Sequence, residues 1–150
     1  MSPLCVCGFS LNCFTWSLPS VSSSPNRELG RTPVTTPTSN PPPPVSGSTI
    51  SSADIGAPAP AGATTVVTAG RDYDLKAGGA DVWGTSDQFR FAYRQLTGDF
   101  DVIVRVDSLT ATDPWAKAGL MARESLAADA RNVFALATPG ANGYRLQTRT

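Results

Sequence analysis

From residue 64 onward, hydrophobic and polar side chains alternate with a period of two along the chain. This pattern is typical of strands that bury one face and leave the other in water. The clearest run is 88–96, in which three aromatic side chains share one face. After a turn at residues 97–99, the run 100–106 alternates hydrophobic side chains with mostly charged ones. These two runs together predict an antiparallel hairpin.

Five further runs have a less regular alternation and also predict strands: 64–68, 71–76, 120–125, 133–138 and 144–150. Residues 126–132 are rich in alanine, but seven residues are too few for a stable helix, so we expect a loop or a single helical turn. Short strands at intervals of about ten residues, with turns marked by glycine or proline, predict an all-β fold. The expected architecture is an antiparallel β-sandwich or jelly roll.

The first 60 residues have a different composition from the rest of the chain. They contain only four charged side chains but 11 of the 13 prolines, including the run Pro41 to Pro44 within Ser/Thr-rich sequence. Such a tract has too few apolar side chains to offset the entropy of ordering it. We therefore expect an unstructured leader over 1–19, a disordered Pro/Ser/Thr-rich linker over 20–52 and a folded domain over 53–150.

The leader leaves several interpretations open. Its three cysteines, Cys5, Cys7 and Cys13, could bind a soft metal, but a fourth ligand is missing, and an unordered segment accounts for them as well. Residues 4–18 are hydrophobic like a signal peptide, yet no Lys or Arg precedes them. They are also too short and too polar to span a bilayer. A misplaced translation start, or a chain cut from a larger gene product, would explain the leader equally well.

Charge and composition exclude several classes of function. Twelve basic and twelve acidic side chains give a net charge of zero, so no excess of positive charge favours binding to DNA or RNA. The chain contains no histidine, which excludes a Ser-His-Asp relay and every zinc site that uses histidine. We expect neither a nucleic-acid partner nor a membrane span.

Three segments resemble a known family when they are taken in order: ADVWGTSDQFRF at 80–91, LTGDFDVIVRVDSL at 96–109 and TDPWAKAGLMARESL at 112–126. Together they resemble a bacterial subgroup of the concanavalin A-like lectin/glucanase superfamily, of undefined function and sometimes described as regulation-of-enolase-like. The resemblance covers about residues 53–150. It implies a jelly-roll module of a secreted multidomain protein, with further strands after Thr150, so that this sandwich would be truncated and incomplete. It also implies an extracellular location and other domains of the same parent protein as partners.

Glycoside hydrolysis needs two carboxylates that face each other across the scissile bond. The best candidates are Asp99, Asp101 and Asp107, which share one face of the predicted strand with Arg105. A solvated strand face explains these residues more simply, so we expect no catalytic residues and no enzyme activity. A fragment of a glycoside hydrolase stays an alternative.

Carbohydrate binding requires an exposed aromatic ring and a few polar groups beside it. Trp83 precedes Gly84 at a junction between loop and strand, and Trp115 lies in a loop between Asp113 and Lys117. Either ring could instead plug one end of the sandwich. Arg123 has the same strand parity as Lys117, so both could line a sheet face, although Arg123 could equally pair with a charge on a neighbouring strand.

The sequence therefore predicts a non-catalytic carbohydrate-binding or accessory module whose partner is a polysaccharide or another glycan. The tentative ligand-binding residues are Trp115, Asp113, Lys117, Trp83 and Arg123. A structural or protein-interaction sandwich without a sugar ligand is the alternative. No cofactor is expected, and calcium held by Asp113 with Asp107 would lack a diagnostic loop.

Overall fold

The computed structural model describes residues 2–8, 10–17 and 50–150. These residues form ten strands and no helix. The strands are β1 (Ser2–Gly8), β2 (Ser10–Ser17), β3 (Ser51–Ile55), β4 (Ala63–Thr68), β5 (Asp72–Ala77), β6 (Phe89–Leu96), β7 (Arg105–Val106), β8 (Ala118–Arg123), β9 (Asn132–Ala137) and β10 (Tyr144–Arg149). The prediction of an all-β fold is confirmed. In this part of the chain there is no helix long and apolar enough to cross a membrane.

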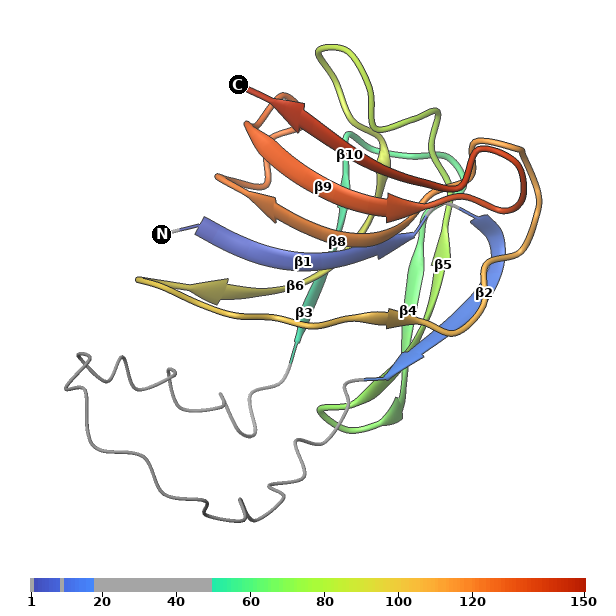
Figure 1. The fold of residues 1–150 in the computed structure, drawn as a ribbon, viewed down its shortest axis with the longest axis horizontal. Helices are drawn as coiled ribbons and strands as arrows, with labels where there is room; N and C mark the ends of the chain where they lie inside the picture. Colours follow the sequence, from blue (N-terminus) through green and yellow to red (C-terminus); the bar gives the residue numbers. More distant parts are fainter. Residues whose placement is uncertain (1, 9, 18–49) are drawn as a thin grey trace, which may run out of the picture.

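The strands form two antiparallel sheets (Figure 1). The larger sheet has the order β10-β9-β8-β1-β6-β3, and the smaller one has the order β4-β5-β2-β7. All paired neighbours run antiparallel. Five of the predicted strands, 64–68, 71–76, 120–125, 133–138 and 144–150, correspond to β4, β5, β8, β9 and β10. The stretch 126–132 contains no helix.

Strand β6 is buried on both faces and connects two hydrophobic clusters. One face carries Phe89 and Phe91, which pack with Met121 and Phe134 of the same sheet. The opposite face carries Ala92, which joins a cluster that includes Tyr73 and Leu75 of the smaller sheet. The cluster around Ala92 is therefore the contact between the two sheets. The cluster around Phe89 and Phe91 lies on the other face of the larger sheet, where loops cover it.

Loops 78–88 and 124–131 cover the cluster around Phe89 and Phe91, and a backbone hydrogen bond connects them there. Val82 belongs to that cluster, and the N–H of Asp87 donates to the carbonyl oxygen of Ala128 over 2.8 Å. Gly56 lies directly under the same loop, with a φ of 66°. A Cβ atom at this position would lie 2.0 Å from the backbone oxygen of Asp87, so only glycine fits without moving the loop.

The predicted hairpin between 88–96 and 100–106 is wrong. Only Arg105 and Val106 form a strand, β7, and it pairs with β2 in the smaller sheet, whereas β6 lies in the larger sheet. Both edges of β6 are already occupied, by β1 and β3, so no edge is left for residues 100–106. Alternation predicts that a segment can form a strand, but it does not identify the strand's partner.

The N-terminal segment also differs from the prediction of an unstructured leader over 1–19. Residues 2–8 form β1, which pairs with β6 on one side and β8 on the other. Residues 10–17 form β2, which lies between β5 and β7. Neighbours more than 50 residues away satisfy the backbone groups of these strands, and such pairing leaves no local signal. Strand β3 begins at Ser51, inside the predicted linker, and residues 20–49 of that linker lie outside the described residues.

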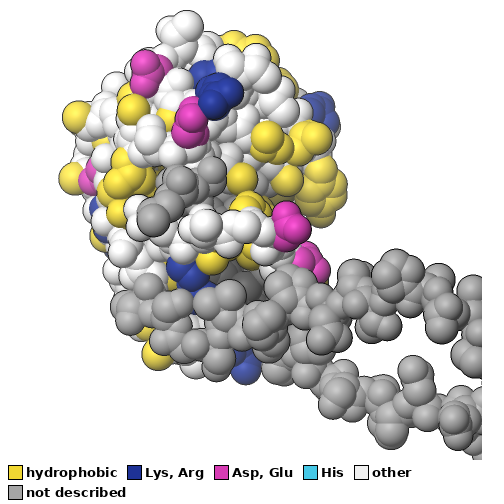
Figure 2. All heavy atoms as spheres, turned by 90° about the vertical axis from the view of Figure 1, so that its left-hand side faces the viewer, with side chains coloured by type: hydrophobic (Ala, Val, Ile, Leu, Met, Phe, Trp, Pro, Cys, Tyr) yellow, Lys and Arg dark blue, Asp and Glu magenta, His cyan; other side chains and the backbone are white. Residues whose placement is uncertain are grey.

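Large hydrophobic side chains are also exposed on the described surface, and Figure 2 shows hydrophobic patches between a few charged side chains on one face. The most exposed are Tyr144 and Leu146 on β10, at 85% and 70%, followed by Trp83 at 69%. Apolar side chains are common on protein surfaces, so a functional argument needs a polar partner beside one of them.

Candidate functional site

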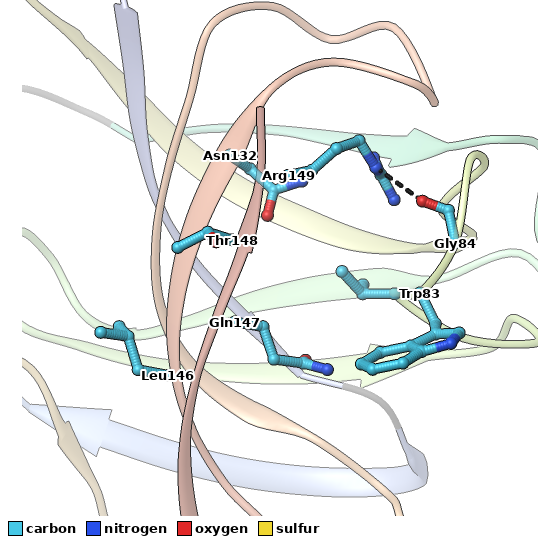
Figure 3. Close-up of a pocket in the computed structure, with 8 residues that line it drawn as sticks. Trp83, Gly84, Asn132, Leu146, Gln147, Thr148 and Arg149 are labelled. Carbon is cyan, nitrogen blue, oxygen red and sulfur yellow. Dashed lines mark hydrogen bonds between the residues drawn. The ribbon is translucent and has the colours of Figure 1, made fainter.

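Trp83 forms one wall of an open cleft of about 430 Å³. It lies in the loop between β5 and β6, immediately before Gly84, whose φ of 62° turns the chain back. The indole ring is largely exposed. The opposite wall comes from β10, and the lining residues are Val82, Trp83, Gly84, Asn132, Leu146, Gln147, Thr148 and Arg149 (Figure 3).

Gln147 lies opposite the indole ring in this cleft. By the register of β9 and β10 it faces the same side of the sheet as Arg149, because it pairs with Phe134 while Arg149 pairs with Asn132. Figure 3 shows the Gln147 side chain pointing toward Trp83. The Gln147 Oε1 atom is buried and has no hydrogen-bond partner among the described residues. A buried polar atom without a partner needs an explanation, and a bound ligand is one candidate.

Beneath the cleft, the carboxylate of Asp87 binds two arginines. Arg149 donates to both carboxylate oxygens, over 2.8 Å from Nη1 to Oδ2 and also from Nη2 to Oδ1. Arg149 Nε donates to the carbonyl oxygen of Gly84 over 2.9 Å, which fixes the turn after Trp83 to β10 (Figure 3). The hydrogen bond with Asp87 raises the pKa of the Arg149 side chain. This arginine therefore stays charged and holds the two walls of the cleft together.

Arg123 is the second arginine on Asp87, and its side chain is completely buried, as is that of Asp87. Its Nη1 lies 3.2 Å from Asp87 Oδ2, and its other nitrogens donate to the carbonyl oxygens of Ser125 and Ala127. The guanidinium also lies over the rings of Phe89 and Phe91, at 5.2 and 5.5 Å from their centroids. The structure thus places this predicted ligand-binding residue under the cleft, where it supports the loops.

Lys117, a predicted ligand-binding residue, is also buried. Its Nζ donates to Asp81 Oδ1 over 2.5 Å and to the carbonyl oxygen of Val82 over 3.1 Å. The same nitrogen lies 5.8 Å from the centroid of the Trp83 ring. Lys117 therefore anchors the loop of Trp83 and contacts the ring by a cation–π interaction.

Trp115 and Asp113 border a second depression of about 490 Å³. Trp115 is 52% exposed, and its backbone N–H donates to Asp113 Oδ1 over 2.7 Å. Asp81 also lines this depression. Its carboxylate binds Lys117, which contacts the ring of Trp83. Asp81 and Lys117 therefore connect the two tryptophan surfaces.

The structure thus brings Lys117 close to Trp83, and Asp113 close to Trp115, while Arg123 lies apart from both surfaces. Sequence reasoning missed Gln147 and Asp87. Gln147 and Arg149 lie on a predicted strand, and the alternation places both on the same face of it. Nothing in the sequence, however, places this strand, β10, beside the loop of Trp83. In the described ranges no group of three or more His, Cys, Asp or Glu side chains could hold a metal ion.

Comparisons with protein-family models, with curated proteins and with solved structures find no match. Any account of function therefore depends on the geometry of these two surfaces.

Proposed function

We propose that this chain is a non-catalytic carbohydrate-binding module with a concanavalin A-like β-sandwich fold, and that a glycan binds in the cleft between Trp83 and Gln147. The observation that carries the proposal is the exposed Trp83 indole facing an amide whose Oε1 has no partner among the described residues. The Pro/Ser/Thr-rich tract and the family resemblance support a place in a larger extracellular protein with other domains.

The chemistry of a sugar matches these two groups. The C–H face of a pyranose ring stacks on an indole, while its hydroxyl groups donate and accept hydrogen bonds at the edge. A hydroxyl that donates to Gln147 Oε1 would satisfy a buried acceptor, and leaving such an atom unpaired costs about 1–3 kcal/mol. Arg149 and Lys117 already hold the walls of the cleft in place, so binding requires only that the Gln147 side chain turn its buried Oε1 atom toward the ligand.

The carboxylates near these surfaces support binding rather than hydrolysis. Asp87 is completely buried and bound by two guanidinium groups, so it cannot reach a glycosidic oxygen. Asp81 binds Lys117, and Asp113 accepts a hydrogen bond from the backbone N–H of Trp115. A hydrolase would need a proton donor and a second carboxylate that face the ligand together.

A protein-interaction module is the second candidate, because a different surface supports it. Tyr144 and Leu146 project from the side of β10 that carries Thr148, and by register they neighbour Ala135 and Ala137 of β9. Tyr144, Leu146 and Ala135 are exposed, and Ala137 is half-buried. No described residue therefore covers this apolar surface. Leu146 also lines the cleft, but Tyr144 does not, so substitution of Tyr144 can test this surface separately.

The test is a glycan array followed by calorimetric titration of the full chain with the best polysaccharide. We expect saturable binding that Trp83→Ala abolishes, because the stacking surface is lost. Tyr144→Ala is the matched control: it removes an aromatic ring that is even more exposed but lies outside the cleft. Failure of the wild-type chain to bind any glycan, or full retention of binding by Trp83→Ala, would contradict the proposal. Loss of glycan binding in Tyr144→Ala alone would place the sugar on the outer surface of β10 and would also contradict a site beside Trp83.

A further inference from the structure

Residues 99–107 have the pattern of a complete strand, yet only two of them are paired. Hydrophobic side chains occupy every even position from 100 to 106, and Asp101 and Arg105 lie on the odd positions. The structure assigns a strand only to Arg105 and Val106, although the chain between β6 and β7 is extended (Figure 1). The segment therefore has a strand sequence without a complete strand partner.

This segment lies at an open edge of the smaller sheet. Strand β7 is the last in the order β4-β5-β2-β7, and on its outer side no described strand pairs with it. Val104 and Val106 pack on the cluster between the sheets, so these two even positions face the core. Ile103 faces the other way and is 61% exposed, and Phe100 is exposed as well. An open edge leaves backbone N–H and C=O groups that can pair with a second strand.

We propose that the segment 99–107 pairs in antiparallel orientation with the same segment of a second copy, across a two-fold axis at Ile103. The two smaller sheets then form one continuous sheet across the dimer. Such a contact uses the same surface on both copies and closes after two subunits.

The sequence of the segment is complementary to itself in this register. With Ile103 opposite Ile103, Asp101 lies opposite Arg105 of the second copy, and this pair of opposite charges occurs twice. Val102 then lies opposite Val104, and Phe100 opposite Val106, so the hydrophobic face is continuous across the axis. Arg105 already binds Asp107 over 2.5 Å, and in the dimer it would lie between two carboxylates. The unfavourable pair, Asp99 with Asp107, is at the ends, where Arg105 screens it.

Neighbouring registers are worse for clear reasons. A shift of one residue places the hydrophobic face of one copy beside the charged face of the other. A shift that centres Val104 places Asp101 opposite Asp107. A shift that centres Val102 does pair Asp99 with Arg105, but it places Asp101 opposite the hydrophobic Ile103 on both sides of the axis. Opposite charges stabilise directly opposed positions and like charges destabilise them, so the register at Ile103 is favoured.

The test is sedimentation velocity of the full chain over a range of concentrations. We expect an equilibrium between monomer and dimer, and Ile103→Lys should weaken it at least about tenfold, because two lysines would face each other at the axis. Val67→Lys is the matched control, because Val67 is similarly exposed, at 55%, on β4 at the opposite edge of the same sheet. Thermal unfolding of both variants checks that the monomer is intact.

A charge exchange tests the register itself. Asp101→Arg should weaken the dimer, and the addition of Arg105→Asp in the same chain should restore it, since the opposed charges are then complementary again. A monomer at every concentration, a dimer that Ile103→Lys leaves unchanged, or a double variant as weak as Asp101→Arg alone would overturn the proposal. Assembly that grows beyond two copies would overturn it as well.

Discussion

Replacing Asp87 by Asn tests whether the two walls of the cleft depend on one buried carboxylate. The substitution keeps the size of the side chain but removes the negative charge that faces Arg123 and Arg149. Arg123 has no exposed side-chain surface, so its charge would stay buried after the opposing carboxylate charge of Asp87 is lost.

Breaking a buried ion pair by removing one partner costs about 3–5 kcal/mol. Total unfolding free energies are about 5–15 kcal/mol, so this loss is a large fraction of the stability. At roughly 4 °C per kcal/mol for a domain of this size, the midpoint of thermal unfolding falls by about 12–20 °C. Arg149 is partly exposed and can turn toward water, so Arg123 carries most of the penalty.

The assay is thermal unfolding followed by circular dichroism, with Glu124→Gln as the control. Glu124 forms an exposed ion pair with Arg131, and its removal should leave the midpoint unchanged. Adding Arg123→Met to Asp87→Asn should recover part of the loss, because the buried charge is then gone. If Asp87→Asn shifts the midpoint as little as Glu124→Gln does, the carboxylate does not hold the two loops.

Three further predictions concern the N-terminal strands, an exposed carboxylate and the cleft. Deletion of residues 1–17 should unfold the chain, seen as loss of sheet signal in circular dichroism, because the seven paired positions of β1 and β6 alone contribute about 1 kcal/mol each; a folded deletion variant would contradict the sheet order. The hydrogen bond from Arg131 lowers the pKa of Glu124, so the small contribution of this exposed pair to stability is present above the unfolded pKa and is lost as the pH falls through the folded one; carbon NMR titration should show the pKa rising in Arg131→Gln, and an unchanged value would refute the pair. Gln147→Ala should weaken glycan binding about 5- to 150-fold by calorimetry, equivalent to about 1–3 kcal/mol, with the unfolding midpoint unchanged; unchanged affinity would remove Gln147 from the site.

The sequence was sufficient to predict those strands whose side chains alternate. Strand β6 was predicted at residues 88–96 and occurs at Phe89–Leu96, since its aromatic residues give a clear period of two. The pattern failed where pairing at a distance decides the structure. Residues 2–8 lie between β6 and β8, and the run 100–106 is mostly unpaired, because alternation does not identify neighbours.

The candidate site was predictable only in part, for the same reason. Trp83 and Trp115 stood out as aromatic side chains in polar loops, and both are exposed. Their surroundings come from other segments: Lys117 reaches Trp83 across 34 positions of sequence, and Gln147 belongs to the last strand. A single sequence carries no signal for such contacts, and the burial of Lys117 and Arg123 followed from partners that only the fold brings near.

The most direct test of a sugar site beside Trp83 is fluorine NMR of the chain labelled with fluorotryptophan. The sequence contains three tryptophans, so three resonances are expected, and the Trp83→Phe variant identifies the resonance of Trp83. Addition of the polysaccharide that binds best on the array should shift the Trp83 resonance saturably, with the same dissociation constant as calorimetry. A Trp83 resonance that stays unchanged while the glycan binds, or the absence of binding by any glycan, would contradict a sugar site in this cleft.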